Sequence, residues 1–345
     1  MGAGTMRSSP PIIIRTSNQI FRVYPRPNER RIFSIEGSPL QANDDAMITS
    51  FRKVLGVALV WIALAANAPA EGVVAPGAKP LKISNEFIFT EGPSADRAGN
   101  VFFTDQPNDR IMEYSVDGKI SEWLKPAGRA NGTRFDRGGN LIACADEHNQ
   151  LWSISPDKKI TVLVSDFAGH LLNGPNDVWV LANGDIYFTD PLYVRDYWKR
   201  SSASEQPGHF VYFRDHRTGA VRVVDRNFKQ PNGIVGAPDD KTLYVSDIGA
   251  GRTYVYQIES DGSLTHRQLF CQLGSDGMTT DDQGDIYLTG KGVTVFDRSG
   301  QKIDHIAIDE PWTANLTFCG PDRDHLFIAA STAVYVVKMR VHGVR

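Results

Sequence analysis

A hairpin phrase that recurs six times restricts the fold of this chain more than any other feature. In residues 173–190, NGPNDVWVLANGDIYFTD, an apolar run leads into an Asn-Gly-Asp turn, and a second β-rich run ends in Thr-Asp. Two such runs joined by an Asn-Gly turn predict a β-hairpin. The second half of the phrase recurs at residues 98–105, 138–146, 182–190, 240–247, 283–290 and 322–329, a spacing of about 40 to 57 residues that is typical of propellers and solenoids.

Each hairpin is followed by further β-rich runs, such as residues 110–115 and 119–124, and no apolar residues recur at helical spacing over a sufficient window. The repeating unit is therefore expected to be a four-stranded meander. One such unit cannot bury both faces, whereas six in a ring can do so without leaving a long exposed edge. We predict an all-β fold, a six-bladed β-propeller of four-stranded antiparallel blades, closed by an N-terminal strand within residues 81–89.

The segment before the propeller has the pattern of an export signal. Met47 begins a short basic segment, an apolar run extends from Val54 to Ala66, and small residues offer cleavage after Ala68 or Ala70. The run is shorter than the roughly 20 residues of a membrane span, so we expect cleavage, with an uncleaved anchor as the alternative. Residues 1–46 are then a leader outside the mature protein, residues 47–70 a secretory signal peptide and residues 71–345 the catalytic propeller domain of a periplasmic or secreted protein.

Composition narrows the choice of partners. The formal net charge of −3 gives no basic footprint for nucleic acid or an anionic membrane, so after signal cleavage the expected partner is a small molecule. The cysteines are Cys144, Cys271 and Cys319, without a Cys-x-x-Cys pair. Each lies in an apolar β-like run, which predicts buried free thiols rather than a zinc site or a disulfide framework.

One polar position recurs in all six copies, nine or ten residues before the turn, and we call it the polar slot. The first strand of each propeller meander is the innermost, so one register in every copy predicts one height in the central channel. The slot residues are Glu91, Asn131, Asn176, Asn232, Asp276 and Asn315.

Carboxylate and amide oxygens converging at one height would form a hard, all-oxygen site with two formal negative charges. Such a site suits Ca²⁺ or Mg²⁺, and also Mn²⁺, whereas softer metals prefer His or Cys. Asn-Gly and Asp-Gly are also ordinary turn dipeptides, which is the alternative explanation. No glycine follows Asn176 or Asn315, so turn chemistry does not explain the whole set.

The second strands return to the same end of the channel, where Asp146 and Asp190 are candidates for substrate contact. His148, on the loop after Asp146, could donate a hydrogen bond to substrate. The alternative for these residues, and for Asp105 and Asp247, is a structural role in which the carboxylate binds backbone amides of nearby loops. The third copy also carries a polar insert, residues 191–208, whose aromatic residues are expected to line or cover a site.

Short motifs at the slot resemble the gluconolactonase, senescence-marker-protein and luciferin-regenerating-enzyme family. They are EGP at 91–93, LNGPNDV at 172–178, QPNG at 230–233, SDGM at 275–278 and NLTF at 315–318, and the resemblance runs from residue 81 to the end. It implies a six-bladed propeller with one divalent cation, Ca²⁺ as the expected ion and Mg²⁺, Mn²⁺ or Zn²⁺ as alternatives. The implied metal ligands are Glu91, Asn176, Asn232 and Asp276.

The same resemblance places Asp276 at the position of the general base, and Asn131 and His148 at positions that line the substrate pocket. Asn315 is also expected in the pocket, but only because it occupies the polar slot; the family resemblance does not imply it. The implied reaction is metal-dependent hydrolysis of a sugar lactone such as gluconolactone to its hydroxy acid. Two alternatives stay open: an organophosphate or aryl-ester hydrolase using the same metal, and an exported ligand-binding propeller without catalysis. The sequence has no Gly-x-Ser-x-Gly, His-Glu-x-x-His or phosphate-loop motif.

Overall fold

The structure, a computed structural model, describes residues 12–16, 19–23 and 72–344. The chain divides into two compact units, Met1–Pro69 and Ala70–Arg345. In the first, β1 (Ile12–Thr16) pairs with β2 (Gln19–Val23) as an antiparallel hairpin. The expected signal peptide, residues 47–70, lies outside the described residues. Within the described part of the chain, a membrane-spanning apolar helix is not found.

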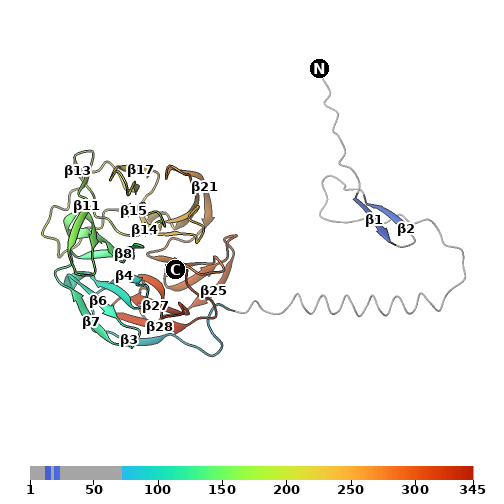
Figure 1. The fold of residues 1–345 in the computed structure, drawn as a ribbon, viewed down its shortest axis with the longest axis horizontal. Coiled ribbons are helices and arrows are strands. Elements are labelled where there is room, and N and C mark those ends of the chain that lie inside the picture. Colours follow the sequence, from blue (N-terminus) through green and yellow to red (C-terminus); the bar gives the residue numbers. More distant parts are fainter. Residues whose placement is uncertain (1–11, 17–18, 24–71, 345) are drawn as a thin grey trace, which may run out of the picture. The chain divides into compact units, whose positions relative to one another are not determined.

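Six four-stranded antiparallel sheets form the second unit and follow one another around a ring (Figure 1). The predicted six-bladed β-propeller is therefore confirmed. The first three blades are β4 (Thr90–Ala95), β5 (Val101–Asp105), β6 (Arg110–Tyr114) and β7 (Ile120–Leu124); β8 (Ala130–Phe135), β9 (Leu141–Ala145), β10 (Gln150–Ile154) and β11 (Ile160–Val164); and β14 (Val178–Val180), β15 (Ile186–Asp190), β16 (Phe210–Arg214) and β17 (Val221–Asp225).

The last three blades complete the ring. They are β18 (Pro231–Gly236), β19 (Thr242–Asp247), β20 (Arg252–Ile258) and β21 (Leu264–Cys271); β22 (Met278–Thr280), β23 (Ile286–Gly290), β24 (Gly292–Phe296) and β25 (Lys302–Ile306); and β26 (Asn315–Cys319), β27 (His325–Ala330), β28 (Ala333–Lys338) and β3 (Leu81–Ser84). Three single-turn 3-10 helices follow second strands: η1 (Gln106–Asn108), η2 (Asp146–His148) and η3 (Ile248–Ala250). A further hairpin, β12 (Asp166–Phe167) with β13 (His170–Leu171), follows the second blade.

Closure of the ring depends on β3, the strand predicted within residues 81–89. β3 pairs antiparallel with β28, so the first strand of the unit becomes the outermost strand of the last blade. The segment before it is also held there, because Val74 bridges to Met339 and the buried Val73 packs in the core cluster of Leu326 and Val337.

Burial changes steadily from the inside of a blade to its outside. Every residue of the second strands β5, β9, β15 and β23 is buried, because the sheets pack face to face and cover both sides of these strands. The outermost β11 is mostly exposed. The core therefore sits between neighbouring blades, where fully buried rings such as Tyr187, Phe213 and Phe327 fill the space. All three cysteines are buried free thiols, as predicted.

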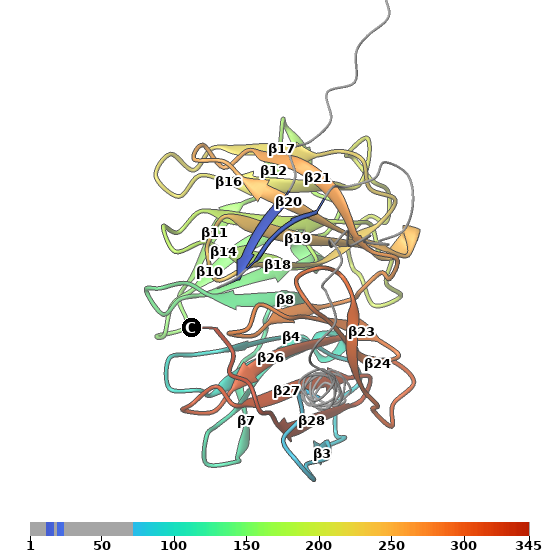
Figure 2. The same cartoon turned by 90° about the vertical axis from the view of Figure 1, so that its right-hand side faces the viewer.

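The inner strands touch each other around the central channel. β4 lies between β8 and β26 (Figure 2), and β18 contacts both β14 and β22. Among the described residues no continuous ladder joins the blades here. Isolated backbone hydrogen bonds, such as that from the Gly132 N–H to the Asn176 carbonyl, and side-chain hydrogen bonds make the links. Thr104 and Thr189, in the penultimate position of the second strands, each donate from Oγ1 to the slot carbonyl of the following blade, Asn131 at 3.2 Å and Asn232 at 2.8 Å. Thr289 donates likewise to the Ala314 carbonyl at 2.8 Å.

Deleting the closing strand should destabilise the whole ring. A variant that begins at Asn85 loses the β3 pairing and the buried Val73, and burial of one valine side chain alone stabilises by about 1.5 to 3 kcal/mol. We expect its Tm to fall by about 10 °C or more relative to a variant that begins at residue 71, measured by circular dichroism. Equal Tm values for the two truncations would contradict the closure described here.

Candidate metal centre

The six slot residues lie at corresponding points of the six blades. Three of them are the second residue of an inner strand: Glu91 in β4, Asn131 in β8 and Asn232 in β18. Asn315 is the first residue of β26, and Asn176 and Asp276 lie two residues before β14 and β22. In three blades the inner ladder is irregular at this point, with register shifts between Glu91 and Ser94, between Ala130 and Thr133, and between Pro231 and Ile234. An extra residue in one strand re-aims side chains, which explains why the slot faces the channel in copy after copy.

Glycines after the slot residues serve close approach rather than turns. A Cβ on Gly132 would lie 2.5 Å from the Asn176 carbonyl oxygen, and one on Gly233 would lie 2.7 Å from the Asp276 carbonyl oxygen. Because each glycine lacks a Cβ, the backbone of the next blade's inner strand can pack directly against the backbone of the glycine. This is the physical reason for the recurrent Asn-Gly pairs, and it replaces the turn explanation considered from sequence.

Four slot residues meet in one cavity of about 230 Å³. Two of them, Glu91 and Asp276, are carboxylates. A fifth slot residue, Asn315, donates from Nδ2 to Glu91 Oε2 at 3.0 Å. The full lining is Phe89, Glu91, Asn131, Tyr193, Arg195, Asn232, Ile248, Asp276 and Trp312.

Two slot residues, Asn176 and Asn315, are not part of this lining, and only Asn315 binds a lining carboxylate. Asn176 is placed differently. It is buried, and its backbone carbonyl accepts a hydrogen bond from the Gly132 N–H at 2.7 Å. Its neighbour Asp177, which the sequence reasoning missed, is also buried. The Asp177 carboxylate accepts hydrogen bonds from the backbone of Val178 at 2.9 Å and of Ile234 at 3.4 Å, and so links the third inner strand to the fourth.

Hydrogen bonds fix the orientation of Asn232 and Asp276. Asn232 Nδ2 donates to Asp276 Oδ1 at 2.8 Å and to the Tyr193 hydroxyl at 2.9 Å, so the amide oxygen must point elsewhere. That oxygen is buried and has no hydrogen-bond partner among the described residues. Trp312 Nε1 donates to Asp276 Oδ2 at 2.6 Å, which holds the carboxylate from its other side.

The electrostatics of the cavity favour a cation. Burial raises the pKa of Glu91 well above its ordinary value, and the nearby carboxylates of Asp276 and Asp177 raise it further. Burial also raises the pKa of Asp276 to about 6 and that of Asp177 to about 7. Burying several carboxylates close together is costly, and Arg195 is the one positively charged side chain in the lining. A divalent ion would relieve this cost and occupy the unpartnered Asn232 oxygen, so the residues present fit an oxygen-ligated metal such as Ca²⁺.

The candidate aspartates at the ends of second strands are already hydrogen-bonded. The two carboxylate oxygens of Asp190 accept the backbone N–H groups of Gly174 and Asn173 at 2.8 and 2.9 Å. Asp105 and Asp247 bind the residues before their own first strands in the same way. Asp190 is also not part of the cavity lining. Its hydrogen bonds support the structural alternative, in which the carboxylate orders the residues that lead into the inner strand.

Asp146 and His148 are also placed away from the cavity lining. Asp146 accepts hydrogen bonds from Trp198 Nε1 at 3.0 Å and from Gln106 Nε2 at 3.1 Å, and pairs with Arg200 at 3.2 Å. His148 is exposed, with its ring 5.1 Å from that of Trp152. Neither residue is in the lining. Asp146 anchors the insert and His148 is exposed, so the substrate contacts expected for them stay a prediction.

The insert of residues 191–208 reaches the cavity, as the sequence reasoning expected. Tyr193 and Arg195 belong to the lining, and Tyr193 binds Asn232 directly. Sequence reasoning singled out the aromatic residues of this insert but missed Arg195. It also missed Trp312, which lies on the loop before β26 and outside the repeated phrase.

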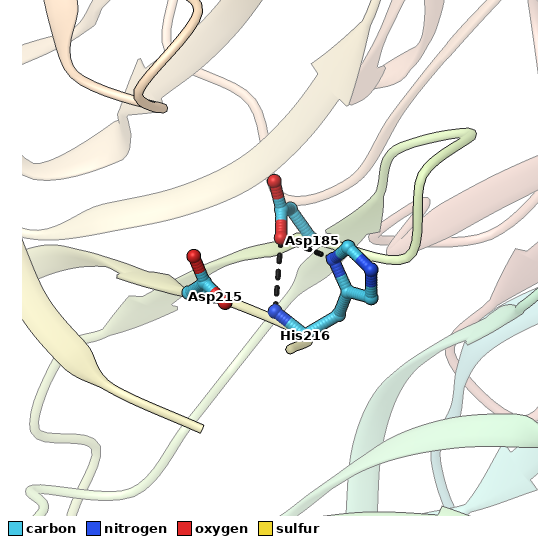
Figure 3. Close-up of side chains that lie close together, drawn as sticks. All are labelled: Asp185, Asp215 and His216. Atoms are coloured by element: carbon cyan, nitrogen blue, oxygen red, sulfur yellow. Dashed lines mark hydrogen bonds and ion pairs between the residues drawn. The ribbon is translucent and has the colours of Figure 1, made fainter. Parts of the chain in front are cut away.

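A second group of potential metal ligands lies on two turns of the third blade (Figure 3). Asp185 Oδ1 accepts hydrogen bonds from both the backbone N–H and Nδ1 of His216, at 2.9 and 2.8 Å. Asp215 Oδ1 accepts the N–H groups of Arg217 and Thr218, both at 2.8 Å. The group thus ties the β14–β15 turn to the β16–β17 turn with its own hydrogen bonds.

A larger cavity, of about 430 Å³, lies further along the inner strands, next to Ser94, Trp179 and Thr280. Its two lining carboxylates are engaged: Asp136 accepts the Asn140 N–H at 2.8 Å, and Asp240 accepts the Ala182 N–H at 3.1 Å. The smaller cavity is the better candidate for chemistry, because it brings together two carboxylates and an amide oxygen that has no hydrogen-bond partner among the described residues.

Replacing Glu91 should weaken metal binding. In Glu91→Gln the side chain keeps its shape but loses the charge that attracts the ion, and we expect Ca²⁺ affinity to fall about tenfold or more by isothermal titration calorimetry. Asp185→Asn, which changes the internally bonded group of the third blade, serves as the matched control and should bind Ca²⁺ like the parent protein. Unaltered affinity in Glu91→Gln, or an equal loss in the control, would count against this centre.

Comparison with known proteins agrees with this geometry. The family model described as "SMP-30/Gluconolactonase/LRE-like region" matches residues 89–332. A gluconolactonase of Zymomonas mobilis is 26% identical over 290 residues, covering 76% of this chain and 81% of that protein. A lactonase drp35 of Staphylococcus haemolyticus is 25% identical over 251 residues, covering 66% of this chain and 71% of that protein.

Among solved structures, a gluconolactonase of Xanthomonas campestris superposes with a TM-score of 0.73 at 26% identity, over 77% of this chain and 91% of the other. The family match spans all the inner-strand residues that line the cavity. The chain belongs to the SMP-30/gluconolactonase/LRE-like family.

Proposed function

We propose that this protein is a metal-dependent lactonase that hydrolyses a sugar lactone such as gluconolactone to its hydroxy acid. The observation that carries the proposal is the convergence of Glu91, Asp276 and the unpartnered amide oxygen of Asn232 in one cavity. Membership of the family supports it, as does the lactonase activity named for relatives that align over most of their length.

Glu91, Asn232 and Asp276 would hold the divalent cation, with Asn176 as a further candidate that the cavity lining does not include. Ca²⁺ is the proposed ion, because the donors are all oxygens, with Mg²⁺, Mn²⁺ or Zn²⁺ as alternatives. When bound, such an ion polarises the lactone carbonyl and lowers the pKa of a coordinated water. Asn315, which donates to Glu91, keeps that carboxylate in place.

Asp276 would move the proton. Its two oxygens accept from Asn232 and Trp312, yet each carboxylate oxygen retains a second acceptor position. Asp276 takes a proton from the attacking water as the water oxygen bonds to the carbonyl carbon. The ring carbon–oxygen bond then breaks, and Asp276 returns the proton to the leaving alkoxide, so that the lactone and one water give one hydroxy acid.

Asp276→Asn should abolish turnover while the fold persists. The amide cannot accept the proton, and general base catalysis typically contributes about 100-fold or more, so kcat for gluconolactone should fall at least that far. Circular dichroism should show an unchanged Tm within a few degrees. An unchanged kcat in this variant would remove Asp276 from the proposed role.

A substrate panel separates this function from its two alternatives. Gluconolactone, a fluorophosphate and an aryl acetate should be assayed side by side, with and without chelator. We expect the lactone to be hydrolysed fastest and the rate to be lost on chelation. Faster turnover of the fluorophosphate or the acetate would instead favour an organophosphate or aryl-ester hydrolase, and no turnover with intact ligand binding would favour a binding propeller.

We also propose that the protein is exported, on the basis of the basic, apolar and small-residue pattern in residues 47–70. Expression of the full chain in a bacterium should deliver a periplasmic or secreted protein whose N-terminus, determined by mass spectrometry, lies after Ala68 or Ala70. Replacing the apolar run between Val54 and Ala66 with polar residues should block this processing. A mature protein that retains residues 47–70 inside the cell would refute export.

A further inference from the structure

We propose that Arg195 selects lactones that carry an anionic group, a carboxylate or a phosphate, over neutral lactones. This inference rests on the lactonase function proposed above and names the substrate class of the same cavity. Arg195 lies in the insert between β15 and β16 and lines the cavity together with Glu91 and Asp276.

The insert is anchored by hydrogen bonds both before and after Arg195 in the sequence. Following Arg195, Trp198 and Arg200 bind Asp146, and the Lys199 N–H donates to Glu147 Oε1 at 3.0 Å. Further along, Gln206 Nε2 donates to the carbonyls of His170 and Leu171 at 3.0 and 3.1 Å. Before Arg195, the Tyr193 hydroxyl accepts from Asn232. The residues around Arg195 are therefore fixed before any ligand arrives, as a specificity element requires.

The guanidinium of Arg195 has unused hydrogen-bonding capacity. It lies 5.0 Å from the centre of the Tyr193 ring. Its Nε is buried and has no hydrogen-bond partner among the described residues. Arg200 Nε is also without such a partner, but the Arg200 guanidinium pairs with Asp146 through Nη2. A buried donor without an acceptor is costly, so an oxygen-bearing ligand is the missing partner.

The charges that line the cavity lead to the same conclusion. Glu91 and Asp276 supply two negative charges, which one divalent cation balances. Arg195 is the remaining charged side chain of the lining, so the lining loaded with metal keeps one positive charge. The buried carboxylates outside the lining have other cations nearby: Asp177 interacts with Arg134, and Asp146 pairs with Arg200. An arginine presents a planar fork of donors that matches a carboxylate or phosphate. A substrate with such a group would satisfy both the charge and the unpartnered Nε.

The test compares a neutral lactone with two anionic ones. The neutral probe is gluconolactone; the anionic probes are its phosphate ester at the terminal hydroxyl and glucarolactone, whose terminal carbon is a carboxylate. In Arg195→Gln we expect kcat/KM for at least one anionic lactone to fall about 10- to 100-fold more than for gluconolactone, mainly through KM. Arg195→Lys should recover part of the difference, because it restores the charge without the fork.

Two further measurements isolate the contact. Lys199→Gln removes a positive charge from the same insert at an exposed position outside the lining, and it should leave the ratio of anionic to neutral kcat/KM unchanged. Calorimetry with glucitol 6-phosphate and neutral glucitol, neither of which is a lactone, should show tighter binding of the phosphate ester to the Ca²⁺-loaded parent protein and loss of that difference in Arg195→Gln.

The outcomes divide cleanly. An equal loss for neutral and anionic lactones in Arg195→Gln would overturn the inference, since Arg195 would then serve the common reaction rather than select the substrate. An equal fall in the ratio of anionic to neutral kcat/KM in Lys199→Gln would also overturn the inference. If the parent protein hydrolyses no lactone, the proposed function fails, and the calorimetric arm alone decides whether Arg195 binds an anionic group.

Discussion

The absence of a backbone ladder between blades is the constraint on which the rest of this structure depends. Within each blade four strands pair edge to edge, but the inner strands meet their neighbours only through side chains, isolated backbone hydrogen bonds and close backbone contact. The penultimate hydroxyl residues Thr104, Thr189 and Thr289 carry side-chain links, by donating to carbonyls of the next inner strand. Glycine at Gly132 and Gly233 then removes the Cβ that would keep the strands apart. The sequence phrase repeats because the inner strands of successive blades must make close contacts of this kind with their neighbours.

The same ring holds several acidic side chains close together at the central channel. Glu91 and Asp276 line one cavity and Asp177 is buried nearby, and burial raises the pKa of all three. The energy needed to hold them comes from the ring, whose blades pack fully buried aromatic side chains between them. A divalent cation would favour the charged forms of these carboxylates. Metal binding and the stability of the channel should therefore be linked.

The sequence was sufficient for everything that repeats. Blade number, strand order within a blade, the closing role of β3 and the register of the slot all follow from the periodic phrase, because each copy meets the same packing problem. The roles of Asp190 and Asp146 could not be read in this way. An aspartate at a strand end has the same sequence pattern whether it faces a ligand or two backbone amides, and only the path of the preceding loop decides. Trp312 and Arg195 were missed because they lie on loops that no other copy shares.

The insert and the slot belong to different parts of the architecture. Glu91, Asn232 and Asp276 are set by inner strands that all six blades hold in place, whereas Tyr193 and Arg195 extend from one loop of the third blade, fastened to the second blade through Asp146 and Glu147. A change in that loop that keeps Tyr193, whose hydroxyl binds Asn232, would alter what enters the cavity without releasing a metal ligand. The propeller is in this sense modular: one surface loop can acquire a new ligand preference while the reaction chemistry of the central channel is inherited unchanged.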